Sequence, residues 1–384
     1  MTASQQKKRL SILGSTGSIG VNALKVVENL SHELTVTYLS GNRNAELLIQ
    51  QARKFNPRAV AIVDDAAAGK VAAALPDTEV LQGREGLLEL AGRDDVDLVL
   101  NGLVGSAGME PTVQAINAGV DVALSNKESL VMAGDYIDRL LTQTGVKLFP
   151  VDSEHSAIWQ CLTGEDMVDV ERLILTGSGG PFRTRDKETF DSITVAEALK
   201  HPNWKMGNKI TIDSATMMNK GLEIIEARWL FHLGPDQLDI VVHPQSIIHS
   251  MVEFRDKSVK AQLGVPDMKI PIQYALTWPR HRPADWEPLD LVRVGQLTFE
   301  APDLEKFPCI QLAFEVLKEG GSAPAVLNVA NETAVYRFLR NEIRFTEIPI
   351  MIEKALAAHD LIEHPQMEDI LSLENWTQHY VNQL

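Results

Sequence analysis

Two carboxylates separated by a single residue, Asp152 and Glu154, follow an expected strand at 147–150. This spacing places both side chains on the same face of an extended segment. Two like charges so close together are unfavourable unless a cation or a proton lies between them. Because carboxylate oxygens suit Mg²⁺ or Mn²⁺ better than zinc, the pair predicts a divalent-metal site. Acidic residues in the first turn of a helix would give the same pattern, so that alternative stays open.

A second polar segment, 209–223, carries groups that could bind a phosphate. We expect a strand at 209–213, then a polar loop, then a helix. The segment contains the hydroxyl, amide and ammonium donors that a phosphate requires. These donors are Ser214, Asn219 and Lys220. Glu223, on the first turns of the expected helix, could supply a third carboxylate to the metal site.

A Gly-rich stretch at 175–181 precedes this segment and offers Ser178 as another phosphate donor. The residues that follow include His201 and Trp204, in an irregular part of the chain. We expect 178–208 to act as a mobile lid that excludes water from a bound substrate. Core packing is the alternative role for Trp204.

The N-terminal residues 10–20 have the order strand, glycine-rich turn and helix start, with glycines at 14, 17 and 20. Glycines at such a turn allow the backbone to bend sharply and let a pyrophosphate approach the first N–H groups of the helix. This context predicts nucleotide binding. A tight turn before an ordinary helix is the alternative.

The next expected strand, 34–39, ends without the Asp or Glu that usually binds the ribose of NAD. The residues after it offer donors for a 2′-phosphate instead. They are Asn42, Arg43 and Asn44. NADP is therefore favoured over NAD, although Arg43 could simply be a solvated residue at a helix start. In the loop 125–128, Lys127 and Glu128 follow another strand and could meet the ribose, the nicotinamide or the substrate.

Strands and helices alternate up to about residue 150, which predicts an α/β fold with a Rossmann-like parallel sheet in an NADPH-binding domain at 1–150. From 151 to 285 the pattern indicates a central α+β domain that carries the catalytic, metal and substrate residues. A stretch containing several prolines, 286–310, is expected to be a linker. Helical periodicity then predicts a C-terminal helical bundle at 311–384.

The composition of the 384-residue chain argues against several classes of protein. A net charge of −16 disfavours nucleic-acid binding, because phosphate backbones attract basic surfaces. No apolar stretch reaches the roughly 18 residues of a membrane-spanning helix, so no membrane partner is expected. With two cysteines, Cys161 and Cys309, a disulfide-stapled secreted protein is also disfavoured, and we expect a cytoplasmic chain.

Six stretches of the chain, considered together, are far more specific than any single motif. They are GSTGSIG (14–20), SNKE (125–128), VDSEHSA (151–157), TGSGGPF (176–182), HPNWKMG (201–207) and IDSATMMNKGLE (212–223). The chain resembles the 1-deoxy-D-xylulose 5-phosphate reductoisomerase family along essentially its whole length. One departure lies at 41–44, which lacks the Gly-Lys-Asn of some members, so the contact to the 2′-phosphate is left open.

The resemblance implies a homodimeric enzyme that uses NADPH and a divalent ion, Mn²⁺, Mg²⁺ or Co²⁺. It would convert a sugar phosphate, 1-deoxy-D-xylulose 5-phosphate, to 2-C-methyl-D-erythritol 4-phosphate in the non-mevalonate route to isoprenoids. The implied metal ligands, which are catalytic together with Lys127, are Asp152, Glu154 and Glu223. Lys127 and Ser153 would contact the substrate near the metal, and Trp204 would cover the closed site.

The resemblance also implies how the remaining polar residues divide between substrate and cofactor. The implied residues for the substrate and its phosphate are Ser178, His201, Ser214, Asn219 and Lys220. The implied cofactor-lining residues are Thr16, Gly17, Ser18, Ile19, Gly41, Asn126, Glu128 and Gly207. Two alternatives stay open: a metal- and NADPH-dependent reductoisomerase of acetohydroxy acids, and a non-catalytic NADPH-binding sensor.

Overall fold

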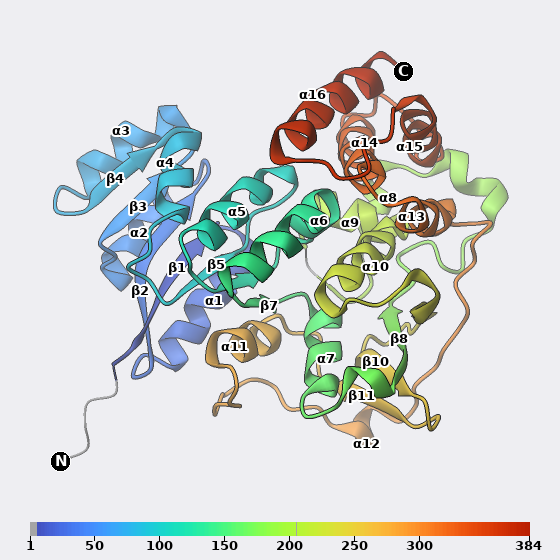
Figure 1. Cartoon of the computed structure of the whole chain (residues 1–384), viewed down its shortest axis with the longest axis horizontal. Helices are drawn as coiled ribbons and strands as arrows, with labels where there is room; N and C mark the ends of the chain where they lie inside the picture. The colour runs from blue at the N-terminus through green and yellow to red at the C-terminus, as the bar shows by residue number, and fades with distance from the viewer. Residues whose placement is uncertain (1–5, 205) are drawn as a thin grey trace. The chain divides into compact units, whose positions relative to one another are not determined.

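The computed structural model describes residues 6–204 and 206–384, which form two compact units (Figure 1). The first unit comprises 6–129, Ile137–Asp152 and Met268–Trp286. The second comprises Leu130–Tyr136, Ser153–Asp267 and Glu287–Leu384. Segment 268–286 belongs to the first unit, where helix α11 (Lys269–Thr277) packs against α1 (Ser18–Asn29).

The first unit is built on a seven-stranded sheet with the order β4-β3-β2-β1-β5-β6-β7, and every pair of neighbours is parallel. The strands are β1 (Lys8–Leu13), β2 (Leu34–Gly41), β3 (Ala59–Ile62), β4 (Glu79–Gln82), β5 (Leu98–Asn101), β6 (Val122–Leu124) and β7 (Leu148–Pro150). The strand order changes direction at β1, beside β5. Open parallel sheets bind ligands at such a switch point, next to the carboxyl ends of the strands.

Helices cover this sheet, which explains why β3, β5 and β6 are buried along their whole length. Besides α1 and α11 they are α2 (Ala45–Phe55), α3 (Asp65–Ala74), α4 (Gly83–Ala91), the 3-10 turn η1 (Ser106–Gly108) and α5 (Met109–Asn117). Helix α6 (Lys127–Thr144) contributes residues to both units. The Rossmann-like parallel sheet expected from the sequence is confirmed.

The second unit contains a four-stranded mixed sheet with the order β11-β10-β8-β9. Its strands are β8 (Val170–Gly177), β9 (Leu238–Val242), β10 (Ile248–Phe254) and β11 (Val259–Leu263). Strands β8 and β9 are parallel, whereas β10 is antiparallel to both of its neighbours. The helices around the sheet are α7 (Ser153–Leu162), α8 (Val195–Ala198), α9 (Asn208–Ala215), α10 (Met218–Phe231) and α12 (Leu291–Val294), with 3-10 turns η2 (Met167–Asp169), η3 (Lys187–Ser192) and η4 (Pro235–Gln237).

The C-terminal helical bundle is part of this second unit. Its helices are α13 (Pro308–Glu319), α14 (Ala323–Leu339), α15 (Glu347–Ala358) and α16 (Met367–Gln383). Buried side chains of α13 and α14 belong to the same apolar core as those of β8 and α10. Gly221 of α10 approaches α13 so closely that a Cβ there would lie 2.6 Å from Cβ of Ala313. The bundle therefore supports the central elements directly.

One predicted element is wrong. Residues 209–213 form a helix, α9, and not a strand. The apolar alternation of Ile210 and Ile212 favoured a strand, but the carbonyl of Gly207 accepts from the backbone N–H of Thr211 at 3.1 Å. Lys209 and Asp213, four residues apart, form an ion pair, which a helix allows because it brings residues i and i+4 close together on adjacent turns.

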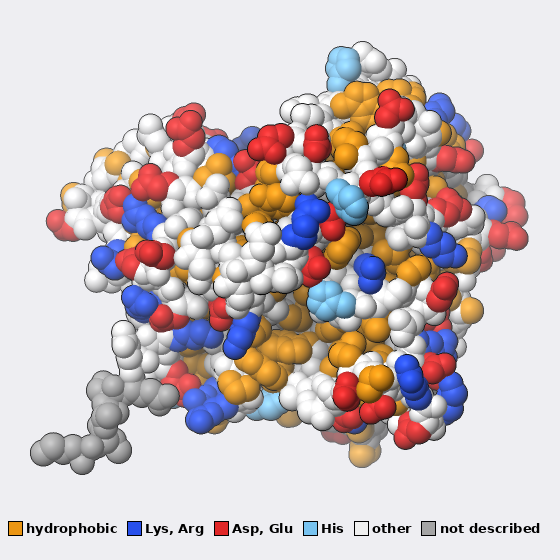
Figure 2. Space-filling model, viewed as in Figure 1, with side chains coloured by type: hydrophobic (Ala, Val, Ile, Leu, Met, Phe, Trp, Pro, Cys, Tyr) orange, Lys and Arg blue, Asp and Glu red, His pale blue; other side chains and the backbone are white. Residues whose placement is uncertain are grey.

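Three short elements, α3, β4 and α4, were not predicted from the sequence. The expected linker, 286–310, includes helix α12 and a bridge between Val242 and Glu300. The expected lid, 178–208, contains η3 and α8. No helix in the described ranges has the length and apolar character needed to cross a membrane. On the face shown in Figure 2, Lys and Arg side chains are interspersed with Asp and Glu side chains.

Candidate active site

The glycine-rich turn between β1 and α1 is shaped by its backbone contacts. Gly14 has φ +77°, and a Cβ on it would lie 2.9 Å from the carbonyl oxygen of Gly102. A Cβ on Gly20 would lie 2.3 Å from Cα of Ser15. By contrast, a Cβ on Gly17 would be 3.3 Å from its nearest neighbour, the carbonyl oxygen of Gly14. The first and third glycines are therefore required for the turn itself.

A buried hydrogen-bond network holds this turn against β2. The Ser15 Oγ lies 2.7 Å from Oε1 of Gln51 and 3.0 Å from the carbonyl oxygen of Ser40, so its single hydroxyl proton has an acceptor on either side. Nε2 of Gln51 returns a bond to the carbonyl of Ser15 at 2.8 Å. The network leaves Gly17 and Ser18 exposed at the start of α1, where the first N–H groups have no partner within the helix.

The end of β2 lies beside this turn. A Cβ on Gly41 would be 3.2 Å from the Cγ2 atom of Thr16. Asn44 caps α2, since its Oδ1 accepts from the backbone N–H of Leu47 at 3.1 Å. The side chain of Arg43 is 85% exposed, with its Nε 3.6 Å from Oδ2 of Asp64. Of the three residues predicted for the 2′-phosphate, Arg43 is thus the one that presents an extended cation to solvent.

The loop before α6 is fixed by Asn126. Its Nδ2 donates to the carbonyl oxygens of Leu103 at 3.1 Å and Gly105 at 2.9 Å, and its Oδ1 accepts from the N–H of Ser129. Next to it, Nζ of Lys127 lies 2.5 Å from Oδ2 of Asp152, and the Lys127 side chain is 5% exposed. The ion pair therefore joins two of the predicted catalytic residues within the first unit.

In the second unit, two predicted metal ligands converge on one lysine. Nζ of Lys220 donates to Oε1 of Glu154 at 2.6 Å, to Oε2 of Glu223 at 2.5 Å and to the carbonyl of Thr176 at 2.6 Å. Burial alone would lower the pKa of Lys220, but the two carboxylates outweigh it and raise that pKa. The cation required between these two acids is thus supplied by the protein itself.

Neighbouring side chains hold both carboxylates in place. The Ser153 hydroxyl donates to Oε2 of Glu154 at 2.6 Å, and Nδ2 of Asn219 donates to Oε1 of Glu223 at 2.5 Å. Glu154 lies in the first turn of α7, so the alternative of an acidic helix start also describes the structure. Asp152 ends the segment of the first unit that immediately precedes Ser153, and covalent geometry keeps its Cα within about 7 Å of that of Glu154.

The predicted lid residues meet at His201. Its Nε2 lies 3.3 Å from the Ser178 hydroxyl, and its Nδ1 accepts from the backbone N–H groups of Asn203 and Trp204. Burial lowers the pKa of His201 to about 4, and the Lys220 ammonium adds to the effect. Because Nδ1 is an acceptor, the ring is neutral and its Nε2–H points to Ser178.

Ser214 and Gly207 mark the two ends of α9. Gly207 precedes the helix as its N-cap residue. Ser214 is half-buried, and a Cβ on Gly180 would lie 2.5 Å from its carbonyl oxygen. The glycine loop after β8 therefore packs directly against the end of α9. Trp204, half-buried, has its ring centroid 6.4 Å from that of His249.

Several residues that support the site were not predicted from the sequence. Gln51 and the carbonyl of Thr176 carried no local signal, because each acts through a partner far away in the chain. His155, at 0% exposure, donates from Nε2 to the carbonyl of Glu223 at 2.8 Å, and its Nδ1 lies 3.3 Å from Oε2 of Glu226. Its position beside Glu154 was visible in the sequence, but its partners on α10 were not.

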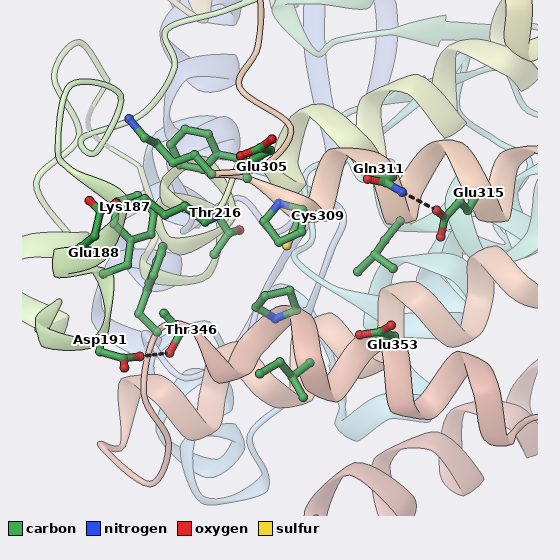
Figure 3. Close-up of a pocket in the computed structure, with 18 residues that line it drawn as sticks. Lys187, Glu188, Asp191, Thr216, Glu305, Cys309, Gln311, Glu315, Thr346 and Glu353 are labelled. Atoms are coloured by element: carbon green, nitrogen blue, oxygen red, sulfur yellow. Dashed lines mark hydrogen bonds between the residues drawn. The ribbon is translucent and has the colours of Figure 1, made fainter.

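A cavity of about 730 Å³ in the second unit is separate from these residues (Figure 3). It is lined by side chains of η3, α13 and α15, including Phe190, Leu312 and Ile350, with Thr216 and Cys309. Lysines and carboxylates occur together around it. None of the predicted site residues lines this cavity.

Three family models match the chain. The model for 1-deoxy-D-xylulose 5-phosphate reductoisomerase matches residues 10–134, that for the C-terminal domain of this enzyme matches 148–231, and the DXP reductoisomerase C-terminal domain matches 263–380. The chain belongs to the 1-deoxy-D-xylulose 5-phosphate reductoisomerase family. The resemblance read from the six motifs is confirmed.

Individual proteins of this family are similar over nearly the full length. Reductoisomerases from Chloroherpeton thalassium and Acetivibrio thermocellus are 54% and 52% identical, over 97% and 98% of this chain and 97% and 99% of their own. The Zymomonas mobilis enzyme solved with NADPH has a TM-score of 0.92 at 41% identity, with 98% of each chain covered. A reductoisomerase solved with NADPH, fosmidomycin and magnesium has a TM-score of 0.93 at 39% identity, also with 98% of each chain covered.

Proposed function

We propose that this chain catalyses the NADPH-dependent rearrangement and reduction of 1-deoxy-D-xylulose 5-phosphate to 2-C-methyl-D-erythritol 4-phosphate, with a divalent ion. It is an NADPH-dependent oxidoreductase of non-mevalonate isoprenoid biosynthesis. Membership of the family supports this activity over the acetohydroxy acid alternative. The observation that carries it is the convergence of Glu154 and Glu223, far apart in sequence, on Lys220.

The divalent ion would be held by Asp152, Glu154 and Glu223. The fit is chemical: the donors are carboxylate oxygens, and Glu154 and Glu223 already face one cationic group, the ammonium of Lys220. Mn²⁺, Mg²⁺ or Co²⁺ would serve. A bound ion would act as a Lewis acid on the ketone and hydroxyl oxygens of the substrate.

The substrate phosphate would be bound by hydroxyl, imidazole, amide and ammonium donors. The proposed set is Ser178, His201, Ser214, Asn219 and Lys220. Neutral His201 can donate through Nε2–H without bringing a second charge beside Lys220. Contacts to the phosphate lie away from the reacting carbons, so their binding energy can position the substrate for the reaction.

At the reacting end, Lys127 and Ser153 would contact the substrate oxygens. The Lys127 ammonium is buried beside Asp152, and a cation in such a site stabilises a developing oxyanion more strongly than it would in water. The Ser153 hydroxyl would orient the same oxygens while it holds Glu154. Trp204 would cover the bound substrate and exclude water.

NADPH would lie across the switch point of the parallel sheet, with its pyrophosphate at the start of α1. The proposed lining is Thr16, Gly17, Ser18, Ile19, Gly41, Asn126, Glu128 and Gly207. The 2′-phosphate would meet Arg43 first, with Asn42 and Asn44 beside it. Bound there, NADPH would supply the hydride for the reduction.

The test is a spectrophotometric assay of NADPH oxidation with 1-deoxy-D-xylulose 5-phosphate, in the presence of Mn²⁺ and again with a chelator. We expect oxidation that requires both the sugar phosphate and the ion. Oxidation with an acetohydroxy acid instead would support the first alternative. Binding of NADPH without any turnover would support the sensor.

We also infer a homodimer that works in the cytoplasm. Two observations support a reducing compartment: Cys161 and Cys309 are free and buried, and burial raises their pKa values to about 11 and about 12. Unreactive thiols of this kind suit a protein without disulfides. Sedimentation equilibrium of the purified chain would give the mass of the assembly, and a monomer at assay concentration would contradict the dimer.

A further inference from the structure

Helix α9, which ends beside the proposed phosphate donors, is anchored from the C-terminal bundle. Nδ2 of Asn331, on α14, donates to Oδ1 of Asp213 at 2.8 Å. Nζ of Lys209 lies 2.9 Å from the other oxygen, Oδ2, of the same carboxylate. All three side chains are buried, with Asn331 at 0% exposure.

Both oxygens of Asp213 are therefore engaged from different directions. Lys209 approaches from the preceding turn of α9, whereas Asn331 approaches from a separate helix. A buried carboxylate is stable only when its oxygens are paired and hydrogen-bonded, so this arrangement favours one rotation of α9 about its axis. The Lys209–Asp213 pair lies within α9 and cannot fix the helix relative to the rest of the unit. The amide of Asn331, on another helix, can.

The rotation of α9 determines where the phosphate donors lie. Ser214 follows Asp213 directly. The chain then passes through Met217, which has φ +60°, into α10 with Asn219 and Lys220. The carbonyl of Ser214 also packs against Gly180, where a Cβ would approach to 2.5 Å. A small rotation of α9 would thus move Ser214 and disturb the start of α10.

We propose that Asn331 is a positioning residue for substrate binding, acting through Asp213 and α9 on the donors that bind the phosphate. This gives the C-terminal bundle a role in the site. The inference rests on the proposed assignment of Ser214, Asn219 and Lys220 to the phosphate.

The same helix provides a matched control. Asn328 lies one turn before Asn331 on α14 and is also at 0% exposure. Neither its amide nitrogen nor its amide oxygen has a hydrogen-bond partner among the residues that the structure describes. Asn328→Leu and Asn331→Leu therefore make the same chemical change in the same helix, but only the second removes a bond to Asp213.

The experiment compares the two variants by steady-state kinetics. Asn331→Leu is expected to raise the KM for 1-deoxy-D-xylulose 5-phosphate about tenfold, the size expected for losing a hydrogen bond to a charged group. Its KM for NADPH should stay within about twofold of the parent value, as should both KM values of Asn328→Leu. Inorganic phosphate, used as a competitive inhibitor, should lose affinity in parallel. Chemical denaturation checks that both variants are folded, and Asn331→Ser replaces the leucine variant if that one does not fold.

A charge-preserving exchange separates positioning from general packing. Asn331→Asp alone faces Asp213 with a second carboxylate and should raise the same KM at least tenfold. Adding Asp213→Asn restores a donor–acceptor pair, with the new amide able to accept from Lys209 and donate to position 331. The double variant should return the KM to within about threefold of the parent.

Equal effects of Asn328→Leu and Asn331→Leu, or an unchanged KM in Asn331→Leu, would overturn the inference, as would a double variant no better than Asn331→Asp. Ser214→Ala tests the phosphate assignment separately from the role of Asn331. If Ser214→Ala leaves the KM for the sugar phosphate unchanged, the phosphate assignment fails and the inference fails with it. If it raises that KM while Asn331→Leu does not, only the role of Asn331 is lost.

Discussion

The turn after β1 and the charged cluster around Lys220 are two ways of preparing a site for an anion. At the turn, the shape comes from the backbone: Gly14 and Gly20 admit contacts that no side chain would allow. At the cluster, side chains from α7 and α10 meet at one ammonium. The first kind of site is local in sequence, whereas the second exists only after distant segments have folded together.

The largest effect on activity should come from a change in the charged cluster around Lys220. Glu223→Gln removes one carboxylate charge, and we expect kcat to fall about a thousandfold, the few kcal/mol that a misplaced Lewis acid would cost. The dissociation constant for NADPH, measured by fluorescence titration, should stay within about twofold because the turn is untouched. Parent turnover at ordinary metal concentration would remove Glu223 from the ligand set.

The complementary experiment alters the turn after β1 and leaves the cluster around Lys220 unchanged. Gly20→Ala places a methyl group 2.3 Å from Cα of Ser15, and we expect NADPH affinity to fall about hundredfold, with stability reduced by about 3 kcal/mol. Gly17→Ala, also at the turn, is the milder comparison, because its Cβ would lie 3.3 Å from the carbonyl oxygen of Gly14, and its effect should be below about fivefold. Similar affinities for the two variants would mean that close packing does not shape the turn.

A smaller effect is expected from Arg43, an exposed cation just after β2. Arg43→Ala should raise the KM for NADPH about tenfold and leave the KM for NADH unchanged, because only NADPH carries the 2′-phosphate. The parent enzyme should prefer NADPH. Equal catalytic efficiency with NADPH and NADH in the parent would contradict the role given to residues 41–44.

The smallest expected effect is the pH dependence that His201 gives to the stability of the fold. With the pKa of His201 at about 4, the folded chain binds fewer protons at this ring than the unfolded chain between pH 4 and about 6.5. Its stabilising contribution is therefore complete above about pH 6.5 and is lost as the pH falls towards 4. NMR titration of the imidazole should give a midpoint near 4, and a midpoint near 6.5 would show that the ring is not buried in solution.

The comparison also explains how much the sequence could predict. The Gly-rich turn, the parallel sheet and most helices follow from local patterns, because period and turn residues act over a few positions. The side chains of the cluster were recognised by type and by family resemblance. The prediction that failed was the strand at 209–213, because Ile210 and Ile212 fit a strand as well as they fit the helix α9. Residues that support the site, such as Gln51, were not predicted. Their partners lie in distant segments, which no local pattern records.

The ammonium of Lys220 has a practical consequence for handling this enzyme. Carboxylates that share a metal ion repel one another once the ion is removed. Here an internal counter-ion lies between Glu154 and Glu223, so their mutual repulsion is offset without any added ion. Protein treated with a chelator should therefore stay folded and could be reloaded in turn with manganese, magnesium or cobalt, which would allow the three ions to be compared on a single preparation.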